Sequence, residues 1–244
     1  METGLHLPAL CGHRGEPSLA PENTLASFAA AIQAGVEWTE TDVCLIGDGT
    51  PVMFHDDSLD RCTDHSGPIQ QLTSADLELV NANRQFKNSA FAAIPTLAHT
   101  LAYANRVGLG LNIELKLHDH VPAAALVDAV VPVLRAHPLP PGRLLLSSFD
   151  FQALRLARAA MESTPMAVIA ENLNDNVLSF ARDINAHSLN LWWETLRVEN
   201  VRQSLDAGFS VNVWTVNDPA LAPTLYSWGV TSIISDRPQD FPAT

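Results

Sequence analysis

The sequence predicts an α/β fold, a (β/α)₈ TIM barrel with a short insert after the second strand. Eight β-like runs alternate with helical runs almost to the C-terminus, and one long polar segment interrupts the alternation. The 244 residues, 47% of them hydrophobic, suffice for one such barrel. An open doubly wound sheet is the alternative arrangement of the same units. The expected strands are Ala9–His13, Glu37–Leu45, Gly110–Leu117, Leu144–Ser148, Pro165–Ile169, Ala186–Leu191, Ser210–Val216 and Thr231–Ser235.

Helical patterns fill the intervals between these strands, and several have recognisable ends. Asn23 is expected to cap the helix that follows it. Glycines that favour a left-handed C-terminus and prolines that favour a helix start stand at the expected places: Gly35, Gly108, Gly208, Pro122, Pro219 and Pro238. The expected helices are Asn23–Ala34, Thr96–Val107, Pro122–Ala136, Phe151–Met161, Asp175–Arg182, Thr195–Ala207 and Pro219–Trp228.

A long segment separates the second strand from the helix at Thr96. It contains a short β-like run, Pro51–His55, and a polar stretch, Asp56–Asn88. A long insert after a barrel strand is usually functional. We therefore expect one domain, residues 1–244, with a functional insert at about residues 56–93.

Composition excludes several classes of function. The net charge of −13 disfavours nucleic-acid binding, which requires clustered Lys and Arg. No apolar run is long enough to span a membrane. The first ten residues have no basic or apolar segment typical of a signal peptide, so the cytoplasm is the expected location. Three cysteines do not suggest a disulfide framework, and we expect reduced, partly buried thiols.

Carboxylates on two adjacent barrel strands predict a metal site. Glu40 and Asp42 share one face of the second strand, because side chains alternate along a strand. By the same alternation Asn112, Glu114 and Lys116 point inward from the third strand. Three inward carboxylates form an oxygen-rich cage that suits Mg²⁺ or Ca²⁺ better than Zn²⁺. The alternative is an internal salt-bridge network centred on Lys116, which would leave three acids for one lysine.

Two histidines stand where barrel active sites are built, at the C-terminal ends of β-like runs. His13 ends the first strand, and His55 ends the short run that begins at Pro51. Histidine can take or give a proton near neutral pH. Arg14 could hold two phosphate oxygens with its planar guanidinium. Most of the nine histidines, including His118, are expected to be surface or packing residues.

A series of short motifs connects these residues from position 13 to position 238. In this order they resemble the glycerophosphodiester phosphodiesterase family over nearly the whole chain, and the block that begins at His13 is the most specific. The matching motifs are His13-Arg14-Gly15, Pro21-Glu22-Asn23-Thr24, Phe28, Ala31, Gly35, Glu40-x-Asp42-Val43, Asp48-Gly49, Val52, His55-Asp56, Leu59, Arg61, Thr63, Gly67, Ile94-Pro95-Thr96-Leu97, Asn112-Ile113-Glu114-x-Lys116, Ser148-Phe149, Trp214-Thr215-x-Asn217 and Asp236-x-Pro238.

The resemblance implies a barrel with an insert after the second strand, a divalent metal ion (Mg²⁺ or Ca²⁺) and a defined set of site residues. Phe149, Trp214 and Trp192 are possible walls for the substrate, and Glu22 is a possible support for the ligand-binding residues. The implied roles are metal binding by Glu40, Asp42 and Glu114, acid–base catalysis by His13 and His55, and phosphate binding by Arg14 and Lys116.

Substrates of the resembled family are small glycerophosphodiesters such as glycerophosphocholine and glycerophosphoethanolamine, hydrolysed to an alcohol and sn-glycerol 3-phosphate. The sequence leaves open which histidine is the acid, whether water or a glycerol hydroxyl attacks, the headgroup preference and the oligomeric state. Departures from the family pattern at Cys62, Ala98-His99 and Ser235 bear on the headgroup preference. The alternatives are a lysophospholipase D and a non-catalytic barrel that binds a phosphorylated ligand.

Overall fold

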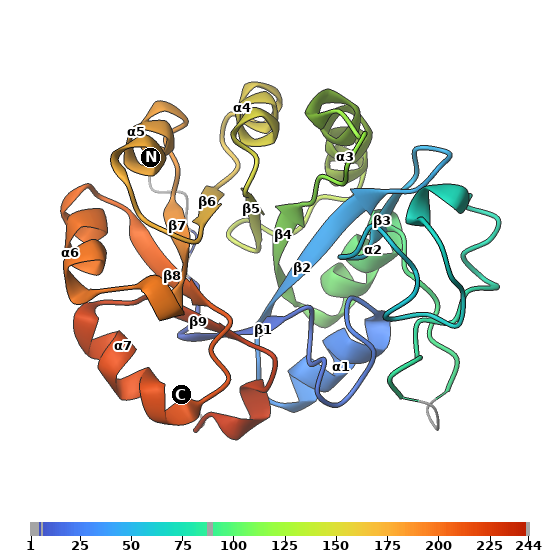
Figure 1. Cartoon of the computed structure of the whole chain (residues 1–244), viewed down its shortest axis with the longest axis horizontal. Helices are drawn as coiled ribbons and strands as arrows, with labels where there is room; N and C mark the ends of the chain where they lie inside the picture. The colour runs from blue at the N-terminus through green and yellow to red at the C-terminus, as the bar shows by residue number, and fades with distance from the viewer. Residues whose placement is uncertain (1–4, 6, 87–89, 243–244) are drawn as a thin grey trace.

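Eight parallel strands close into a barrel in the part of the chain that the computed structural model describes, residues 5, 7–86 and 90–242 (Figure 1). The order around the sheet is β1-β9-β8-β7-β6-β5-β4-β2, and β1 also pairs with β2, which closes the ring. The predicted barrel is confirmed, and the open sheet is wrong. The barrel strands are β1 (Leu10–His13), β2 (Trp38–Leu45), β4 (Gly110–Leu115), β5 (Leu144–Ser148), β6 (Met166–Ala170), β7 (Ser188–Trp192), β8 (Ser210–Trp214) and β9 (Ser232–Ser235).

The helices form a ring outside the strands, as Figure 1 shows. Each presents apolar side chains to the barrel; α3, for example, buries Leu126, Val130 and Leu134 at helical spacing. The helices are α1 (Leu25–Gln33), α2 (Leu97–Val107), α3 (Ala123–Ala136), α4 (Phe151–Ala160), α5 (Asp175–Asp183), α6 (Val198–Asp206) and α7 (Ala222–Trp228). Short 3₁₀ turns are η1 (Ile69–Gln71), η2 (Trp193–Thr195), η3 (Pro219–Leu221) and η4 (Pro238–Asp240).

Most predicted boundaries lie within a few residues of the observed ones, but the cap of α1 was assigned to the wrong residue. Thr24, not Asn23, is the N-cap, and its hydroxyl accepts a hydrogen bond from the Ser27 amide. Asn23 instead adopts a positive φ of 56° and turns its amide toward the barrel. Gly108 ends α2 in the predicted left-handed conformation, at φ 75°.

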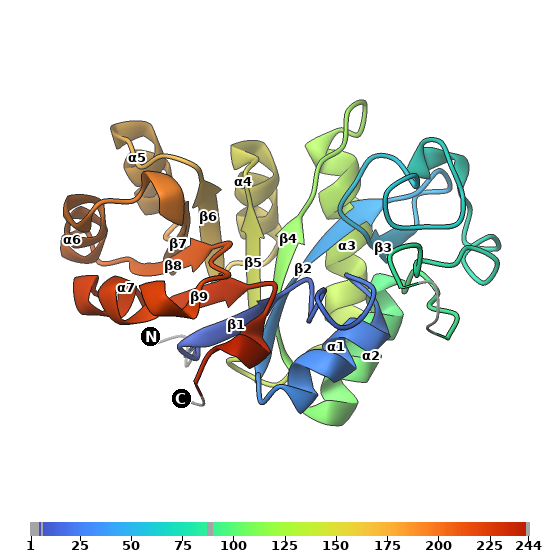
Figure 2. The ribbon, with the colours of Figure 1, turned by 60° about the horizontal axis from the view of Figure 1, so that its bottom comes forward.

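The insert follows β3 (Pro51–Met53), which pairs antiparallel with β2 outside the barrel (Figure 2). Much of the insert is irregular, yet it shares a small apolar core with β2 and β3, which explains how a polar segment remains ordered. Residues 87–89 of the predicted insert lie outside the described residues. The members of this core are Cys44, Ile46, Val52, Phe54, Leu59, Cys62, Ile69, Leu72, Leu77, Val80, Ala82 and Ile94.

The barrel interior changes from apolar to polar toward the C-terminal ends of the strands. At the other end, Cys11, Trp38, Leu145 and Ile234 belong to one apolar cluster. Gly110 is required there, because a Cβ atom at this position would lie 2.3 Å from the Trp38 ring. The apolar cluster closes the barrel, and the polar end carries the candidate site.

The cysteines are free thiols and are more fully buried than predicted, and burial raises the pKa of Cys62 to about 12. None of the helices within the described ranges is long and apolar enough to cross a membrane. Residues 1–4 and 6 of the N-terminal segment, for which no signal peptide is expected, lie outside the described residues.

Candidate active site

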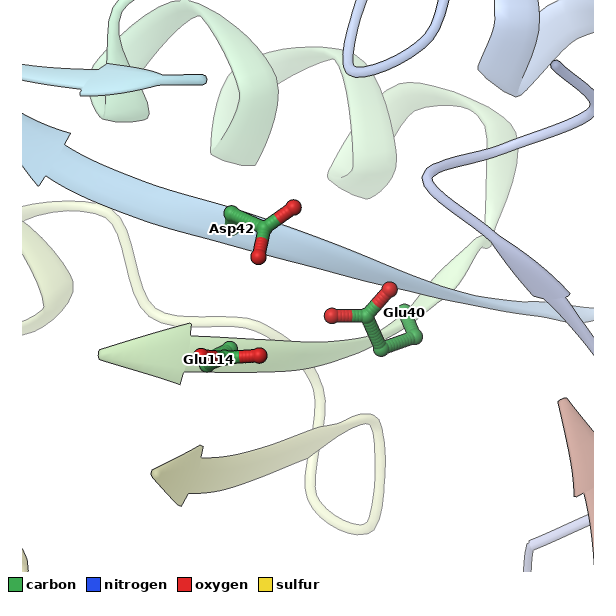
Figure 3. A group of neighbouring side chains, drawn as sticks. All are labelled: Glu40, Asp42 and Glu114. Carbon is green, nitrogen blue, oxygen red and sulfur yellow. The ribbon is translucent and has the colours of Figure 1, made fainter. Parts of the chain in front are cut away.

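Three buried carboxylates meet inside the barrel (Figure 3). Glu40 and Asp42 project from β2, and Asp42 lies beside Glu114 of β4 in the strand register. Their exposed fractions are 5%, 1% and 7%, and one oxygen of each carboxylate lies within 4.8 Å of the others. The structure therefore brings together the three carboxylates that the alternation of side chains along the strands had selected.

The electrostatics of this cluster favour a bound cation. Burial raises the pKa of Glu40 well above its usual value, and the neighbouring Asp42 and Glu114 raise it further. Burial and Asp42 likewise raise the pKa of Glu114, to about 7. Burial alone would also raise the pKa of Asp42, but Arg14, His55 and Lys116 lower it below its ordinary value. A set of carboxylate oxygens without nitrogen or sulfur ligands fits a hard divalent cation, so the cluster could hold one.

Two cationic side chains contact the acidic cluster. The Lys116 ammonium lies 3.1 Å from Glu114 Oε1 and 3.9 Å from Asp42 Oδ1. Arg14 Nε lies 3.3 Å from Asp42 Oδ2. The salt-bridge network considered from the sequence is therefore present in part, but two cations face three carboxylates.

Arg14 reaches this position from a tight turn after β1. Its φ is 52°, and Gly15 follows at φ 90°, where a Cβ atom would lie 2.3 Å from the Ser27 hydroxyl. The Arg14 amide donates to Glu40 Oε2 at 3.3 Å, and Nη1 donates to Glu22 Oε1 at 2.8 Å. The turn therefore aims both the backbone and the side chain of Arg14 at carboxylates.

His13 is paired with a carboxylate from the far end of the chain. Its Nδ1 lies 2.6 Å from Asp236 Oδ1, and its Nε2 lies 3.8 Å from Glu40 Oε2. Asn217 fixes Asp236 by donating to Oδ2 and by accepting from the Asp236 amide, both at 2.8 Å. A carboxylate acceptor at Nδ1 assigns the proton of the neutral ring to Nδ1, so Nε2 faces the acidic cluster with its lone pair.

His55 has an equivalent partner in the next residue of the chain. Its Nδ1 lies 2.7 Å from Asp56 Oδ1. His118, which follows β4, has Nε2 at 2.9 Å from the His55 carbonyl and Nδ1 at 3.4 Å from the Gln70 amide nitrogen. His118 thus joins the barrel to the insert and holds the backbone of His55.

Aromatic side chains lie beside the cations at the same end of the barrel. The rings of Phe149 and Trp214 meet edge to face with centroids 5.5 Å apart, and the Lys116 ammonium lies 5.7 Å from the centre of the Phe149 ring. Trp192 of β7 pairs with Trp214 of β8 in the strand register. Phe149 is 41% exposed although it is a large apolar residue.

Comparison with known proteins shows the family to which the chain belongs. The profile of the glycerophosphoryl diester phosphodiesterase family matches residues 13–240. The chain belongs to this family of enzymes. The glycerophosphodiester phosphodiesterase of Bacillus subtilis (strain 168) is 27% identical over 253 residues, which cover 94% of this chain and 83% of that protein.

One further relative is much longer than this chain, and one solved structure matches it over nearly the whole length of both. Glycerophosphodiester phosphodiesterase domain-containing protein 5 of Gallus gallus is 30% identical over 94% of this chain, which spans only 42% of that protein. A phosphodiesterase of Oleispira antarctica, solved in complex with the product sn-glycerol 3-phosphate, has a TM-score of 0.88 and 35% identity. That match covers 96% of this chain and 95% of the solved chain.

Several residues around the site were not assigned roles from the sequence. Asp236 and Asn217 stand in matched motifs, but the closure of the barrel is needed to bring them to His13. Asn23, predicted only as a cap, donates to Asp42 Oδ2 at 2.9 Å and accepts from the Asp42 amide. His118, grouped with packing histidines, contacts the backbone of His55. In the sequence, these four residues could have been found only because they stand in or next to the matched motifs. Their spacing along the chain does not indicate the contacts that they make.

Proposed function

We propose that residues 1–244 act as one domain that hydrolyses a small glycerophosphodiester, such as glycerophosphocholine or glycerophosphoethanolamine, to an alcohol and sn-glycerol 3-phosphate. Glu40, Asp42 and Glu114 would hold the Mg²⁺ or Ca²⁺ ion that the reaction requires. The buried three-carboxylate cluster, with the Nε2 atom of His13 facing it, is the observation that carries this proposal. Its support is family membership together with the chemistry of the oxygen donors.

Phosphodiester hydrolysis requires positive charge around the phosphate, because the anion repels an incoming nucleophile. Arg14 and Lys116 would bind the non-bridging oxygens and offset the charge that develops on them in the transition state. A divalent cation held by Glu40, Asp42 and Glu114 would supply further positive charge at the site. Arg14 keeps its orientation through Glu22, which accepts from Nη1.

His13 and His55 would move the protons of the reaction. One would accept a proton from the attacking oxygen, and the other would give a proton to the leaving alkoxide oxygen, each accelerating the reaction by roughly 10²–10⁴-fold. Asp236 and Asp56 would keep each ring in the tautomer that presents Nε2 to the substrate. Phe149, Trp214 and Trp192 would contact the carbon skeleton of the substrate.

A lysophospholipase D activity is the second candidate, because the insert carries exposed apolar residues. Leu79 and Phe91 are 70% and 54% exposed. Such side chains could contact an acyl chain, which a glycerophosphodiester lacks.

Product analysis distinguishes these candidates. The protein is incubated with Mg²⁺ or Ca²⁺ and with glycerophosphocholine, glycerophosphoethanolamine or lysophosphatidylcholine, and sn-glycerol 3-phosphate, choline, ethanolamine and lysophosphatidic acid are quantified. We expect at least one glycerophosphodiester to yield sn-glycerol 3-phosphate. The kcat/KM for that substrate should be higher than the kcat/KM for the lysophospholipid. Choline and lysophosphatidic acid released from lysophosphatidylcholine alone would make the protein a lysophospholipase D, and no release from any substrate would refute both.

A further inference from the structure

One arginine of the insert binds two carboxylates that belong to different sides of the active site. Arg61 donates from Nη1 and Nη2 to the two oxygens of Glu22, at 2.6 and 2.7 Å. It also donates from Nε and Nη2 to the two oxygens of Asp56, at 2.6 and 2.8 Å. Both contacts are bidentate, so they fix the orientation of the two carboxylates as well as the distance between them.

The two carboxylates hold the residues that we assign to chemistry and to phosphate binding. Asp56 contacts Nδ1 of His55 at 2.7 Å, and Glu22 accepts from Nη1 of Arg14 at 2.8 Å. Arg61 therefore stands at the centre of a chain of contacts from His55 in the insert to Arg14 in the loop after β1. The loop and the insert are joined at this point by charge-assisted hydrogen bonds.

Arg61 is 41% exposed, and an exposed ion pair usually contributes little to stability. Its partners are less exposed, with side-chain values of 13% for Glu22 and 20% for Asp56. Without the guanidinium between them, the two negatively charged carboxylates would repel each other. The geometry is thus better suited to holding two side chains in register than to stabilising the fold.

We propose that Arg61 is a positioning residue, which sets His55 through Asp56 and Arg14 through Glu22; this inference rests on the proposed function of those two residues. Within the described residues, the ion pairs of Arg61 are made with Glu22 and Asp56 and not with the carboxylates of the acidic cluster. The proposal also gives the insert a task, because the insert supplies both His55 and the arginine that ties it to the barrel loop.

The two arms of this link have separate kinetic consequences. Displacement of His55 weakens a contact needed for proton transfer and lowers kcat. Displacement of Arg14 weakens a phosphate contact that is already made in the ground state, so it raises KM, and the loss of the charge that Arg14 offsets in the transition state lowers kcat as well. Residues that orient a catalytic group in this way typically change activity by about 10- to 100-fold when they are replaced.

The test is a set of steady-state measurements on Arg61→Met, which keeps the length of the side chain and removes its donors. We expect a kcat/KM for the best glycerophosphodiester about 10- to 100-fold below wild type, with kcat lowered and KM raised. Arg84→Met is the matched control, since Arg84 is an exposed arginine of the same insert that donates to the backbone carbonyl of Thr63. The control should stay within about two-fold of wild type.

Double variants decide whether Arg61 acts through its partners. In an Asp56→Asn background Arg61→Met should lower kcat by less than it does in the wild type, and in a Glu22→Gln background it should raise KM little further. Arg61→Lys, which keeps the charge but loses the planar fork, should lie between wild type and Arg61→Met. It is also the variant to use if Arg61→Met is not folded by circular dichroism at the assay temperature.

An active wild type with an Arg61 variant that is folded and unimpaired would overturn this inference alone. Losses that multiply independently in the Asp56→Asn and Glu22→Gln backgrounds would overturn it as well. A wild type without phosphodiesterase activity would instead refute the proposed function.

Discussion

Replacing Glu114 by glutamine separates two effects of the acidic cluster: the cost in stability of its like charges, and its role in activity. The substitution keeps the shape of the side chain and an oxygen for the Lys116 ammonium, which lies 3.1 Å from Glu114 Oε1. It removes one of three carboxylates packed within 4.8 Å of one another. Without metal, the glutamine variant should therefore be more stable than the wild type, although it should be inactive.

The magnitude follows from the pKa of Glu114, which burial and Asp42 raise from 4.5 to about 7. At about 1.4 kcal/mol for each unit of pKa, this difference corresponds to about 3 kcal/mol. The sign follows from the ionised form, which the folded protein disfavours. The penalty is therefore absent below the unfolded-state pKa, grows as the pH rises through the interval between the two pKa values, and is complete above about pH 7.

The assay is urea denaturation of both proteins in EDTA at several pH values. The glutamine variant should be more stable by about 3 kcal/mol at pH 8 and by less than about 1 kcal/mol at pH 5. The control is Glu37→Gln, because Glu37 is exposed and contacts only Arg143 among the ion pairs of the described residues. That change should shift stability by less than about 0.5 kcal/mol at either pH.

Added Mg²⁺ or Ca²⁺ should reverse the order of stability, since a ligand that binds the folded state stabilises it by mass action. The wild type should gain stability with cation concentration, and the glutamine variant should gain much less. An equal or lower stability of the variant in EDTA at all pH values would refute the electrostatic argument. Equal stabilisation of both proteins by the cation would refute the metal site.

Three further predictions concern single residues. Asp236→Asn should lower kcat by at least about 10-fold without loss of the fold, because an amide has one acceptor oxygen where the His13 ring and the Asn217 amide each use one of two, so the tautomer of His13 is no longer fixed; an unchanged kcat would contradict this. His13→Ala and His55→Ala should each lower kcat/KM for glycerophosphocholine by roughly 10²–10⁴-fold. With a p-nitrophenyl phosphodiester, whose leaving group needs no proton, the smaller loss should identify the acid, and equal losses would argue against this division of roles. Gly110→Ala should destabilise the protein by about 1–3 kcal/mol in urea denaturation, because its Cβ would lie 2.3 Å from the Trp38 ring; an unchanged midpoint would contradict the close contact.

The sequence predicts the barrel and the acidic cluster because both follow from the period of a strand. Side-chain alternation along β2 places Glu40 and Asp42 on one face, and the parallel register places Glu114 beside Asp42. Closure of the sheet can also be predicted, since eight strands that alternate with helices match the strand number of this barrel. Local backbone detail is less accessible: Thr24 and Asn23 are both good caps, and only the positive φ of Asn23 decides between them.

Residues that support the site through long-range contacts could not be predicted from spacing. Asp236 lies far from His13 along the chain. Only the pairing of β9 with β1 brings Asp236 Oδ1 to 2.6 Å from His13 Nδ1. His118 contacts the His55 carbonyl because the irregular insert folds back over the end of β4. A residue pattern carries no information about such loop geometry, which depends on tertiary packing.

The most direct test of the central claim measures the release of sn-glycerol 3-phosphate from glycerophosphocholine. The protein is first treated with EDTA to remove metal ions, and release is measured before and after addition of Mg²⁺ or Ca²⁺. We predict no release in EDTA, release on addition of a divalent cation, and no restored release in Glu40→Ala and His13→Ala proteins that circular dichroism shows to be folded. Undiminished release in excess EDTA, or metal-restored release in Glu40→Ala equal to that of the wild type, would contradict the claim that the acidic cluster holds a catalytic metal ion.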